Sequence, residues 1–282
     1  FSVAEGDPRR LQAVVEEACY RIFSAGHTSV LSAKLMDMLQ GILGAQTKAF
    51  KWRTLGPIAM SQGLSNGSFV VGHHGVQPLG AMVMEREVAQ AVAVRLASEL
   101  PALLPKDDID EILLSYERAE RIELNEAQWG AVRLAATKPF VLITGGAGVG
   151  KTTVLKALYE VYDRAGLSVT QLALAGRAAK RMQEATGRPA STIANFLRNP
   201  KAEDLDDRCV VVVDEASMVD IITMSRLCEQ LGPAPRVVLV GDPAQLMPVG
   251  PGLVLHALAK VPQVPLAQLT VVKRYGGAIA TA

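Results

Sequence analysis

The sequence predicts an α/β fold in which a parallel β-sheet, covered by helices on both faces, carries a phosphate-binding loop. After residue 124, short apolar runs at 140–143, 169–173, 210–213 and 237–240 alternate with helical patterns, which is typical of such sheets. One apolar run, residues 140–143, leads directly into a glycine-rich segment and then into a helical pattern. Residues 1–104 instead show apolar side chains at helical spacing, which predicts a separate, mainly helical N-terminal domain.

The first part of this helical domain is predicted to hold two helices. The first shows apolar residues at helical spacing and ends where Gly26 and His27 break the pattern. Thr28 or Ser29 is expected to cap the second helix. Gly41 and Gly44 are expected to end or interrupt it, because glycine is a poor helix former.

A hairpin and a long helix follow in the prediction. Residues 69–76 read as a short hairpin and residues 82–100 as an amphipathic helix, so the domain is predicted to have winged-helix character. His73 and His74 could suggest a metal site, but no third ligand stands at a suitable spacing. A solvated hairpin tip is therefore the favoured interpretation of the two histidines.

The proline-punctuated residues 101–105 are the predicted domain boundary, which gives a helical domain at 1–104 and the α/β domain at 105–282. Acidic residues follow at 107–111. Because carboxylates are favoured in a first helical turn, they are expected to interact with a helix dipole rather than to form a catalytic pair.

The amino-acid composition limits the classes of protein to which the chain can belong. The chain has 282 residues, of which 49% are hydrophobic and 20% charged, and its formal net charge is +1, so any nucleic-acid surface must be a local patch. Cys19, Cys209 and Cys228 show no CxxC spacing, which favours reduced thiols in a cytoplasmic protein. No apolar run approaches the ~20 residues of a membrane span. The chain does not begin with Met, and we expect it to be part of a longer protein.

The glycine-rich segment matches the pattern of a nucleotide phosphate-binding loop. Its glycines let backbone N–H groups turn toward phosphate oxygens at a helix N-terminus. Lys151 is expected to reach the β- and γ-phosphates, and Thr152 is expected to hold Mg²⁺. The alternative is a strand-to-helix turn without a ligand. The expected nucleotide-binding residues are Gly145, Gly146, Ala147, Gly148, Val149, Gly150, Lys151, Thr152 and Thr153.

Two further apolar runs end in polar residues. Residues 210–213 lead into Asp214 and Glu215, which places both carboxylates at the sheet edge where ligands of α/β sheets bind. Asp214 is expected to hold Mg²⁺ and Glu215 to orient and deprotonate water. Residues 237–240 lead into a turn with Gln245, which could sense a γ-phosphate. The alternatives without a catalytic role are an acidic pair that ends a strand and a simple Gly-Asp-Pro turn.

Together these segments resemble the first motor domain of superfamily 1 DNA helicases of the RecD-like group, in family order across residues 124–279. The resemblance implies a RecA-like P-loop domain that hydrolyses ATP with Mg²⁺ and moves 5′ to 3′ on single-stranded DNA. It implies that Gln128 reads the adenine edge and that Arg274 approaches the γ-phosphate from a strand at 269–274. The residues it assigns to DNA, on the rim of the sheet away from ATP, are Arg177, Lys180, Arg181 and Thr192.

The chain departs from the family pattern at several positions. Ala175 replaces a hydroxyl residue in the DNA-side motif, and Ala194 replaces a His. Ala147 and Val149 replace a Pro and a Thr in the phosphate loop, which keeps the backbone donors, and Tyr275 stands where a Gln is usual. We find no segment that could serve as the second motor domain, so we expect the chain to need a C-terminal second motor domain and to be unable to unwind DNA alone.

Other interpretations stay open. The chain could be a DNA-repair accessory ATPase without unwinding activity, or a nucleotide-switched binding module, and its partners could act in repair or recombination. The basic residues 177–181 could form a solvated helix face. Trp129 could stack on a base or on adenine, or could lie in the core.

Overall fold

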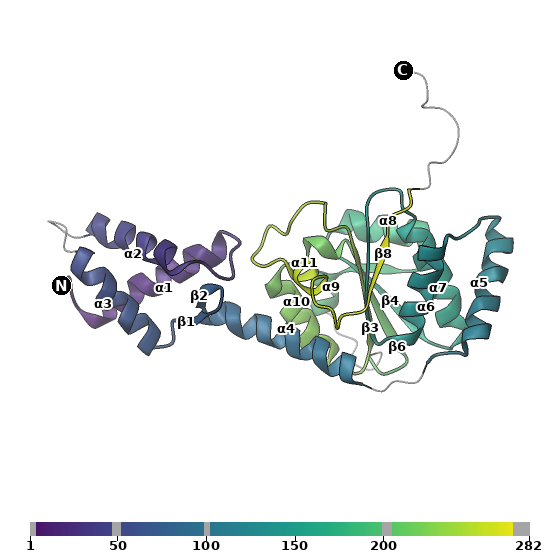
Figure 1. Cartoon of the computed structure of the whole chain (residues 1–282), viewed down its shortest axis with the longest axis horizontal. Coiled ribbons are helices and arrows are strands. Elements are labelled where there is room, and N and C mark those ends of the chain that lie inside the picture. The colour runs from purple at the N-terminus through teal and green to yellow at the C-terminus, as the bar shows by residue number, and fades with distance from the viewer. Residues whose placement is uncertain (1–3, 47–51, 99–101, 199–204, 273–282) are drawn as a thin grey trace, which may run out of the picture. The chain divides into compact units, whose positions relative to one another are not determined.

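The computed structural model describes residues 4–46, 52–98, 102–198 and 205–272. It divides into two compact units (Figure 1). One contains residues 1–88 with 220–225 and 248–252, and the other contains residues 89–219, 226–247 and 253–282. The domain boundary that the sequence predicts between residues 104 and 105 stays a prediction.

The N-terminal region is helical, as predicted. Asp7 begins the first helix by accepting the backbone N–H of Arg9 at 2.9 Å, and the helix ends at Ser24, just before Gly26 with its φ of +89°. The residues that the spacing predicted as its apolar face are buried. The elements are α1 (Pro8–Ser24), α2 (Ser32–Gln46), α3 (Trp52–Ser65), β1 (Phe69–Gly72), β2 (Gly75–Pro78) and α4 (Leu79–Ala97).

Two expectations for α2 were wrong. The helix begins at Ser32, two or three residues later than a cap at Ser29 or Thr28 would place it, because Val30 forms an antiparallel bridge with Val76 through bonds of 2.9 and 2.8 Å. It also continues through Gly41 and Gly44 to Gln46. Burial of Leu35, Leu39 and Leu43 on one face stabilises the helix enough to override the low propensity of its glycines.

The predicted hairpin is present. Strands β1 and β2 pair in antiparallel register from Phe69 opposite Pro78 to Gly72 opposite Gly75, and the exposed His73 and His74 form its tip. Within the described ranges, no three His, Cys, Asp or Glu side chains come together in a way that could hold a metal ion. Winged-helix character stays a prediction.

The second region is an α/β domain, which confirms the predicted fold class. Six strands form one sheet in the order β5-β4-β6-β7-β3-β8, and every neighbouring pair runs parallel. The strands are β3 (Phe140–Gly145), β4 (Ser168–Ala173), β5 (Ala190–Thr192), β6 (Cys209–Asp214), β7 (Arg236–Gly241) and β8 (Leu266–Leu269). The helices are α5 (Lys106–Glu120), α6 (Glu126–Thr137), α7 (Lys151–Arg164), α8 (Gly176–Thr186), α9 (Ile193–Arg198), α10 (Ile221–Leu231) and α11 (Val254–Leu258), with a 3₁₀ turn η2 (Ala216–Met218).

The four strands predicted from apolar runs are β3, β4, β6 and β7, and the two edge strands differ from expectation. Strand β5 has only three residues, all half-buried, and was not predicted. The strand expected at 269–274 lies instead at Leu266–Leu269. Edge strands are short and half-exposed, so they lack the continuous apolar run that identifies a central strand.

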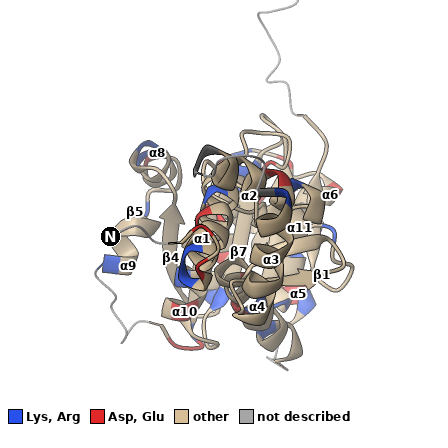
Figure 2. Ribbon diagram, turned by 90° about the vertical axis from the view of Figure 1, so that its left-hand side faces the viewer, with Lys and Arg blue, Asp and Glu red and all other residues tan. Residues whose placement is uncertain are grey.

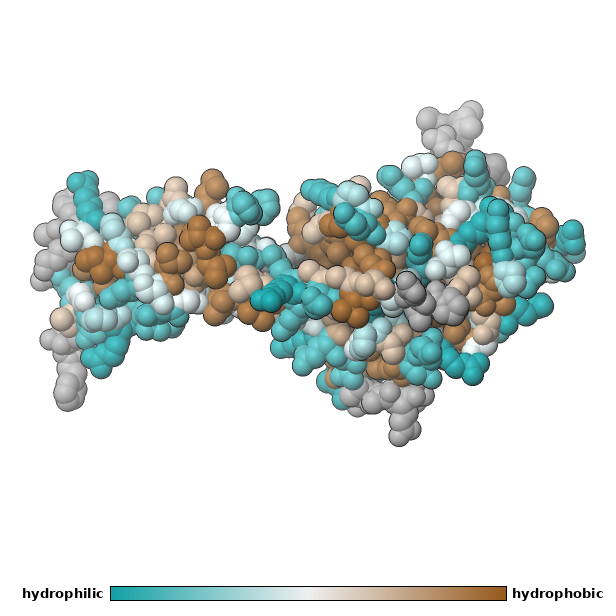
Figure 3. Space-filling model, turned by 60° about the horizontal axis from the view of Figure 1, so that its bottom comes forward, coloured by the Kyte–Doolittle hydropathy of each residue, from teal (hydrophilic) through white to brown (hydrophobic). Residues whose placement is uncertain are grey.

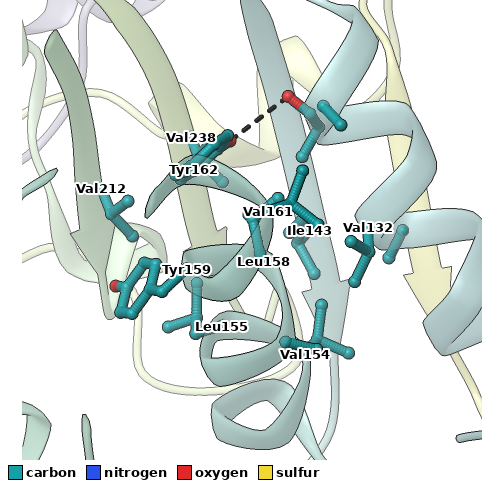
Figure 4. Close-up of a cluster of buried hydrophobic side chains, with 14 of the residues drawn as sticks. Val132, Ile143, Val154, Leu155, Leu158, Tyr159, Val161, Tyr162, Val212 and Val238 are labelled. Atoms are coloured by element: carbon teal, nitrogen blue, oxygen red, sulfur yellow. Dashed lines mark hydrogen bonds between the residues drawn. The ribbon is translucent and has the colours of Figure 1, made fainter. Parts of the chain in front are cut away.

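The core of this domain lies between the sheet and helices α5, α6 and α7. Figure 4 shows the part of this core that α6 and α7 form with the sheet. Alternate residues of the central strands, such as Val212 and Val238, contact apolar residues of α7. The hydroxyl of Tyr162 donates to the carbonyl oxygen of Ala135 at 3.2 Å, which satisfies a polar atom in an otherwise apolar cluster. Asp107 and Asp108 lie in the first turn of α5, as predicted.

The surface is mixed in character. On the face shown in Figure 3, hydrophilic residues surround smaller hydrophobic patches. Among the residues that the structure describes, no helix combines the length and the apolarity needed to cross a bilayer. Cys19 and Cys209 are buried and Cys228 is half-buried, and no disulfide joins these three cysteines in the described residues.

Candidate active site

The phosphate loop connects β3 to the N-terminus of α7, as its pattern predicted. Gly148 and Gly150 adopt φ values of +78° and +85°, a conformation that residues with a Cβ rarely adopt. At Gly145 a Cβ would lie 2.7 Å from the side chain of Val149 and 2.8 Å from the carbonyl oxygen of Leu269. Val149 is itself buried under the loop. The fold therefore requires glycine at these positions and anchors the loop through an apolar side chain.

Lys151 lies at the first position of α7 and folds back onto the loop. Its Nζ donates to the carbonyl oxygens of Gly145 and Gly146, at 2.7 Å each. Thr152 is exposed beside it, and Thr153 is half-buried. The ammonium group is thus held over the same backbone segment whose N–H groups are expected to bind phosphate.

Gln128 lies under the phosphate loop rather than on an open surface. It is 1% exposed, and both ends of its amide bond to the protein. Its Oε1 accepts the backbone N–H of Asn125 at 3.0 Å, and its Nε2 donates to the carbonyl oxygen of Val149 at 3.1 Å. Asn125 in turn accepts the N–H of Gln128, which completes a capping box at the start of α6.

The carboxylate pair follows β6 at the same edge of the sheet. Asp214 ends the strand and accepts the backbone N–H of Glu215 at 2.8 Å. Burial raises the pKa of the Asp214 carboxyl, although that N–H bond and the charges of Lys151 and Arg181 act in the opposite direction. Such a desolvated carboxylate gains from a nearby cation. Glu215 has a φ of +53°, one of two non-glycine residues with positive φ in the described ranges.

The turn after β7 carries Gln245, which is exposed and whose backbone N–H bonds to the carbonyl oxygen of Asp242. Two residues here were not assigned roles from the sequence. Asp242 is 8% exposed, and its Oδ2 is 3.9 Å from where a Cβ on Gly146 would lie, so it adjoins the phosphate loop. His256 contacts the carbonyl oxygen of Pro243 through Nε2 at 2.8 Å. For Asp242, the available sequence signal was its position in a polar turn after a buried strand. No sequence signal marked His256.

The sheet topology explains why these residues meet. Strand β3 pairs with β7, and β7 pairs with β6, all in parallel register, so the loops after their carboxyl ends share one edge. That edge brings together Lys151, Asp214 and Gln245 from segments far apart in the sequence. Arg274 lies outside the described residues.

The residues expected to contact DNA lie on α8 and at the end of β5 (Figure 2). Arg177 and Lys180 are exposed, and Lys180 pairs with Glu184 one turn along at 3.8 Å. Thr192 is half-buried and its hydroxyl accepts the N–H of Asn195, which helps to begin α9. Ala175 precedes α8 and provides no side-chain cap for the helix.

Arg181 differs from the other residues expected to contact DNA, because it also contacts a residue of the candidate active site. Its guanidinium Nη2 donates to Glu215 Oε1 at 3.1 Å, so it touches the carboxylate expected to activate water. Arg181 thus also adjoins the candidate active site, and its expected role in binding DNA stays a prediction. Helix α8 begins just after β4, and β4 is the direct neighbour of β6, with Ala173 opposite Asp214.

Trp129 belongs to the structural framework. Its Nε1 donates to Glu117 Oε1 at 3.1 Å, the guanidinium of Arg133 lies 4.9 Å from its ring centre, and the ring packs on the core. These contacts favour the core interpretation of Trp129 over base stacking.

A family model described as an AAA domain matches residues 123–281. The chain belongs to the AAA domain family. The matched span contains the phosphate loop, both carboxylates and Gln245, so the candidate site lies wholly within the AAA domain.

Curated relatives confirm the resemblance to the RecD-like group. The chain is 36% identical over 190 residues to an ATP-dependent RecD2 DNA helicase of Deinococcus radiodurans, covering 62% of this chain and 26% of the relative. It is 36% identical over 194 residues to the RecD subunit of the RecBCD enzyme of Mycolicibacterium smegmatis, covering 56% and 35%. A probable conjugal transfer protein TraA of Sinorhizobium fredii is 38% identical over 148 residues, covering 51% and 13%. The chain thus spans about a third or less of these relatives.

The AAA domain's residues fit a magnesium nucleotide. The backbone of the phosphate loop is open toward solvent at Ala147 and Gly148, which are exposed. Lys151 lies beside this loop. The half-buried Asp214 carboxylate, with its raised pKa, supplies the oxygen donor that a hard cation prefers. Thr152 has an exposed hydroxyl that could share the same ion.

Proposed function

We propose that this AAA domain is the ATP-hydrolysing half of a RecD-like DNA helicase that moves 5′ to 3′ on single-stranded DNA. The observation that carries the proposal is the shared sheet edge on which Lys151, Asp214 and Gln245 follow β3, β6 and β7. The RecD2 relative, named as an ATP-dependent DNA helicase, supports the reaction class. Direction of movement is taken from the group resemblance.

The residues of the site divide the work of hydrolysis. Lys151 is expected to leave the loop carbonyls and bind the β- and γ-phosphates, because phosphate oxygens carry full negative charge and carbonyl oxygens do not. Glu215 would orient a water molecule and accept its proton, and Gln245 would sense the γ-phosphate. Mg²⁺, held by Thr152 and Asp214, would neutralise phosphate charge. Arg274 is proposed to stabilise the same charge.

DNA is proposed to bind the exposed basic residues of α8. Arg177 and Lys180 would neutralise backbone phosphates, a contact that positions DNA without reading its sequence. We propose that a second motor domain closes over the nucleotide and provides the rest of the DNA track, since coupling hydrolysis to stepping needs two parts that move against each other. Partners in repair or recombination are proposed from the RecD relatives' membership of the RecBCD enzyme.

The test is ATP hydrolysis by the full-length protein, measured by phosphate release with and without a poly-dT oligonucleotide. We expect DNA to accelerate hydrolysis. Lys151→Ala should lower the rate by about a hundredfold or more, because it removes a charge directed at the transferring phosphoryl group. The matched control is Lys156→Ala on the same helix, which should leave the rate unchanged. Hydrolysis that persists in Lys151→Ala would show that the site has been placed wrongly.

A further inference from the structure

Two adjoining cavities lie on the α/β domain between α5 and the C-terminal half of α7, two helices that pack side by side (Figure 1). Their volumes are about 420 and 400 Å³, and Ile112 and Arg164 line both of them. Together they form a groove that runs from Leu104, just before α5, to Glu120 at the end of the helix, and we call it the α5–α7 groove. Because Lys151 begins α7 and Arg164 ends it, roughly 20 Å of helix separates the groove from the phosphate loop.

Acidic side chains dominate the walls of the α5–α7 groove. Its carboxylates are those of Asp108, Glu111, Glu120, Glu160 and Asp163. Among the described residues that line it, Arg164 is the single cation. The whole chain has a formal net charge of +1, so this negative surface is a local feature that repels phosphates and attracts cations. A cluster of carboxylates can also be a solvated helix face, so charge alone does not identify a ligand.

The floor of the groove supplies an observation that charge does not. Tyr116 is 8% exposed and lines the larger cavity, and in the described ranges its hydroxyl has no hydrogen-bond partner. The buried Tyr159 and Tyr162, by contrast, each bond to another group of the domain. Burial raises the pKa of Tyr116 to about 12, and the charges of Glu120 and Glu160 act in the same direction. Because buried polar groups are almost always hydrogen-bonded, this neutral hydroxyl beside two carboxylates is placed to bond to a ligand.

The two carboxylates beside this hydroxyl are open to a partner. Glu120 and Glu160 are exposed, and neither forms an ion pair within the described ranges. Asp163 differs from them, because it pairs with Arg188. Ile112 is buried in the same floor and offers an apolar surface to the stem of a cationic side chain. A hydroxyl, two carboxylates and an apolar floor together match the charged head and the methylene stem of an arginine or a lysine.

The length and composition of the groove distinguish among cationic ligands. Within the described ranges, no three His, Cys, Asp or Glu side chains converge as a metal site requires. From Asp108 to Glu120 the groove follows α5 for roughly 18 Å, which matches about five or six residues of an extended peptide. Arg164 lines both cavities, so it repels a uniformly positive ligand such as a polyamine. A peptide can instead place an uncharged residue opposite Arg164.

We propose that the α5–α7 groove binds a basic segment of a partner protein, with an arginine or lysine side chain between Glu120 and Glu160 and its head group donating to the Tyr116 hydroxyl. The cation of the segment balances the local negative charge, and the uncharged residues of the segment pass Arg164. This surface is independent of the proposed hydrolysis site, because it lies at the other end of α7. A docked partner therefore leaves the phosphate loop accessible.

The experiment measures the fluorescence anisotropy of labelled peptides that are added to the full-length protein. The probes are a panel of peptides about six residues long, each with two arginines at a different spacing and with leucine and serine elsewhere. We expect at least one probe to bind, and its counterpart with citrulline in place of arginine, which lacks the charge, not to bind. Glu120→Gln combined with Glu160→Gln should weaken binding by about tenfold or more, and Tyr116→Phe should weaken it by about fivefold.

The matched control is Glu16→Gln combined with Glu17→Gln, which removes two exposed carboxylates from α1 and changes the net charge by the same amount. This control variant should bind the probe as wild type does. Thermal unfolding checks that each variant is folded. Because Glu120 and Glu160 are exposed and unpaired within the described ranges, their replacement should leave Tm unchanged.

The possible results separate the docking surface from non-specific attraction. Equal binding by wild type and by the Glu120→Gln, Glu160→Gln variant overturns the docking surface, as does a wild-type protein that binds none of the probes. An equal loss of binding in the α1 control variant assigns binding to net charge and overturns it as well. Spermine that displaces the probe as effectively as the unlabelled peptide does contradicts the assignment to a protein segment.

Discussion

Gln128 offers the sharpest test of how the phosphate loop is held. The family resemblance implies that this side chain reads adenine, whereas in the structure it is 1% exposed and bonds to the protein at both ends of its amide. Gly150 packs against it so closely that a Cβ there would lie 2.4 Å from Gln128 Nε2. We therefore predict that Gln128 supports the loop between α6 and α7.

The perturbation is Gln128→Ala, and its size follows from two lost bonds. The variant leaves the N–H of Asn125 and the carbonyl oxygen of Val149 without their partner, and each unsatisfied buried group costs about 1–3 kcal/mol. Stability should fall by roughly 2–6 kcal/mol, which lowers Tm by about 4–24 °C for a domain of this size. Because the loop carries the phosphate contacts, its loosening should weaken every triphosphate to a similar degree, by about tenfold.

The assay is calorimetric titration with ATP, GTP and inorganic tripolyphosphate, alongside thermal unfolding. A support role predicts equal losses for all three ligands and a lower Tm. An adenine-reading role predicts a loss for ATP alone, with GTP, tripolyphosphate and Tm unchanged, and that result would refute our reasoning. Gln183→Ala, an exposed glutamine of α8, is the matched control and should change neither quantity.

Two further predictions concern the same edge of the sheet. Asp214→Asn should raise Tm of the nucleotide-free chain near neutral pH while abolishing magnesium-dependent hydrolysis, because burial raises the pKa of Asp214 and its ionised form destabilises the fold. The gain in Tm should shrink as pH falls through the raised pKa and vanish below the ordinary value near 3.8, so a gain independent of pH from 4 to 8 would contradict it. Gly150→Ala should destabilise the chain by about 1–3 kcal/mol in urea unfolding, since φ is +85° there, whereas Gly130→Ala, with open space around its Cβ, should not.

Much of the α/β domain could be predicted because its signals are local. Strands β3, β6 and β7 are buried along almost their whole length, and each was located by a nearly continuous apolar run. Strand β4 is fully buried only in its second half and contains Thr170 and Gln171, so its run was weaker. The phosphate loop has a spacing that only one kind of strand–turn–helix uses. The edge strands β5 and β8 carried no such run, and their positions depend on pairing with a neighbour.

What the sequence by itself determined is the set of chemical groups: the glycines of the loop, Lys151, the two carboxylates and the basic residues of what became α8. Which of these groups touch one another was decided only by the tertiary structure. The pairing of β4 with β6 brings Arg181 to Glu215, and the capping box of α6 turns Gln128 toward Val149. The physical reason is that a strand's apolar pattern specifies burial but not its neighbour in the sheet, and contacts across the edge depend on that neighbour.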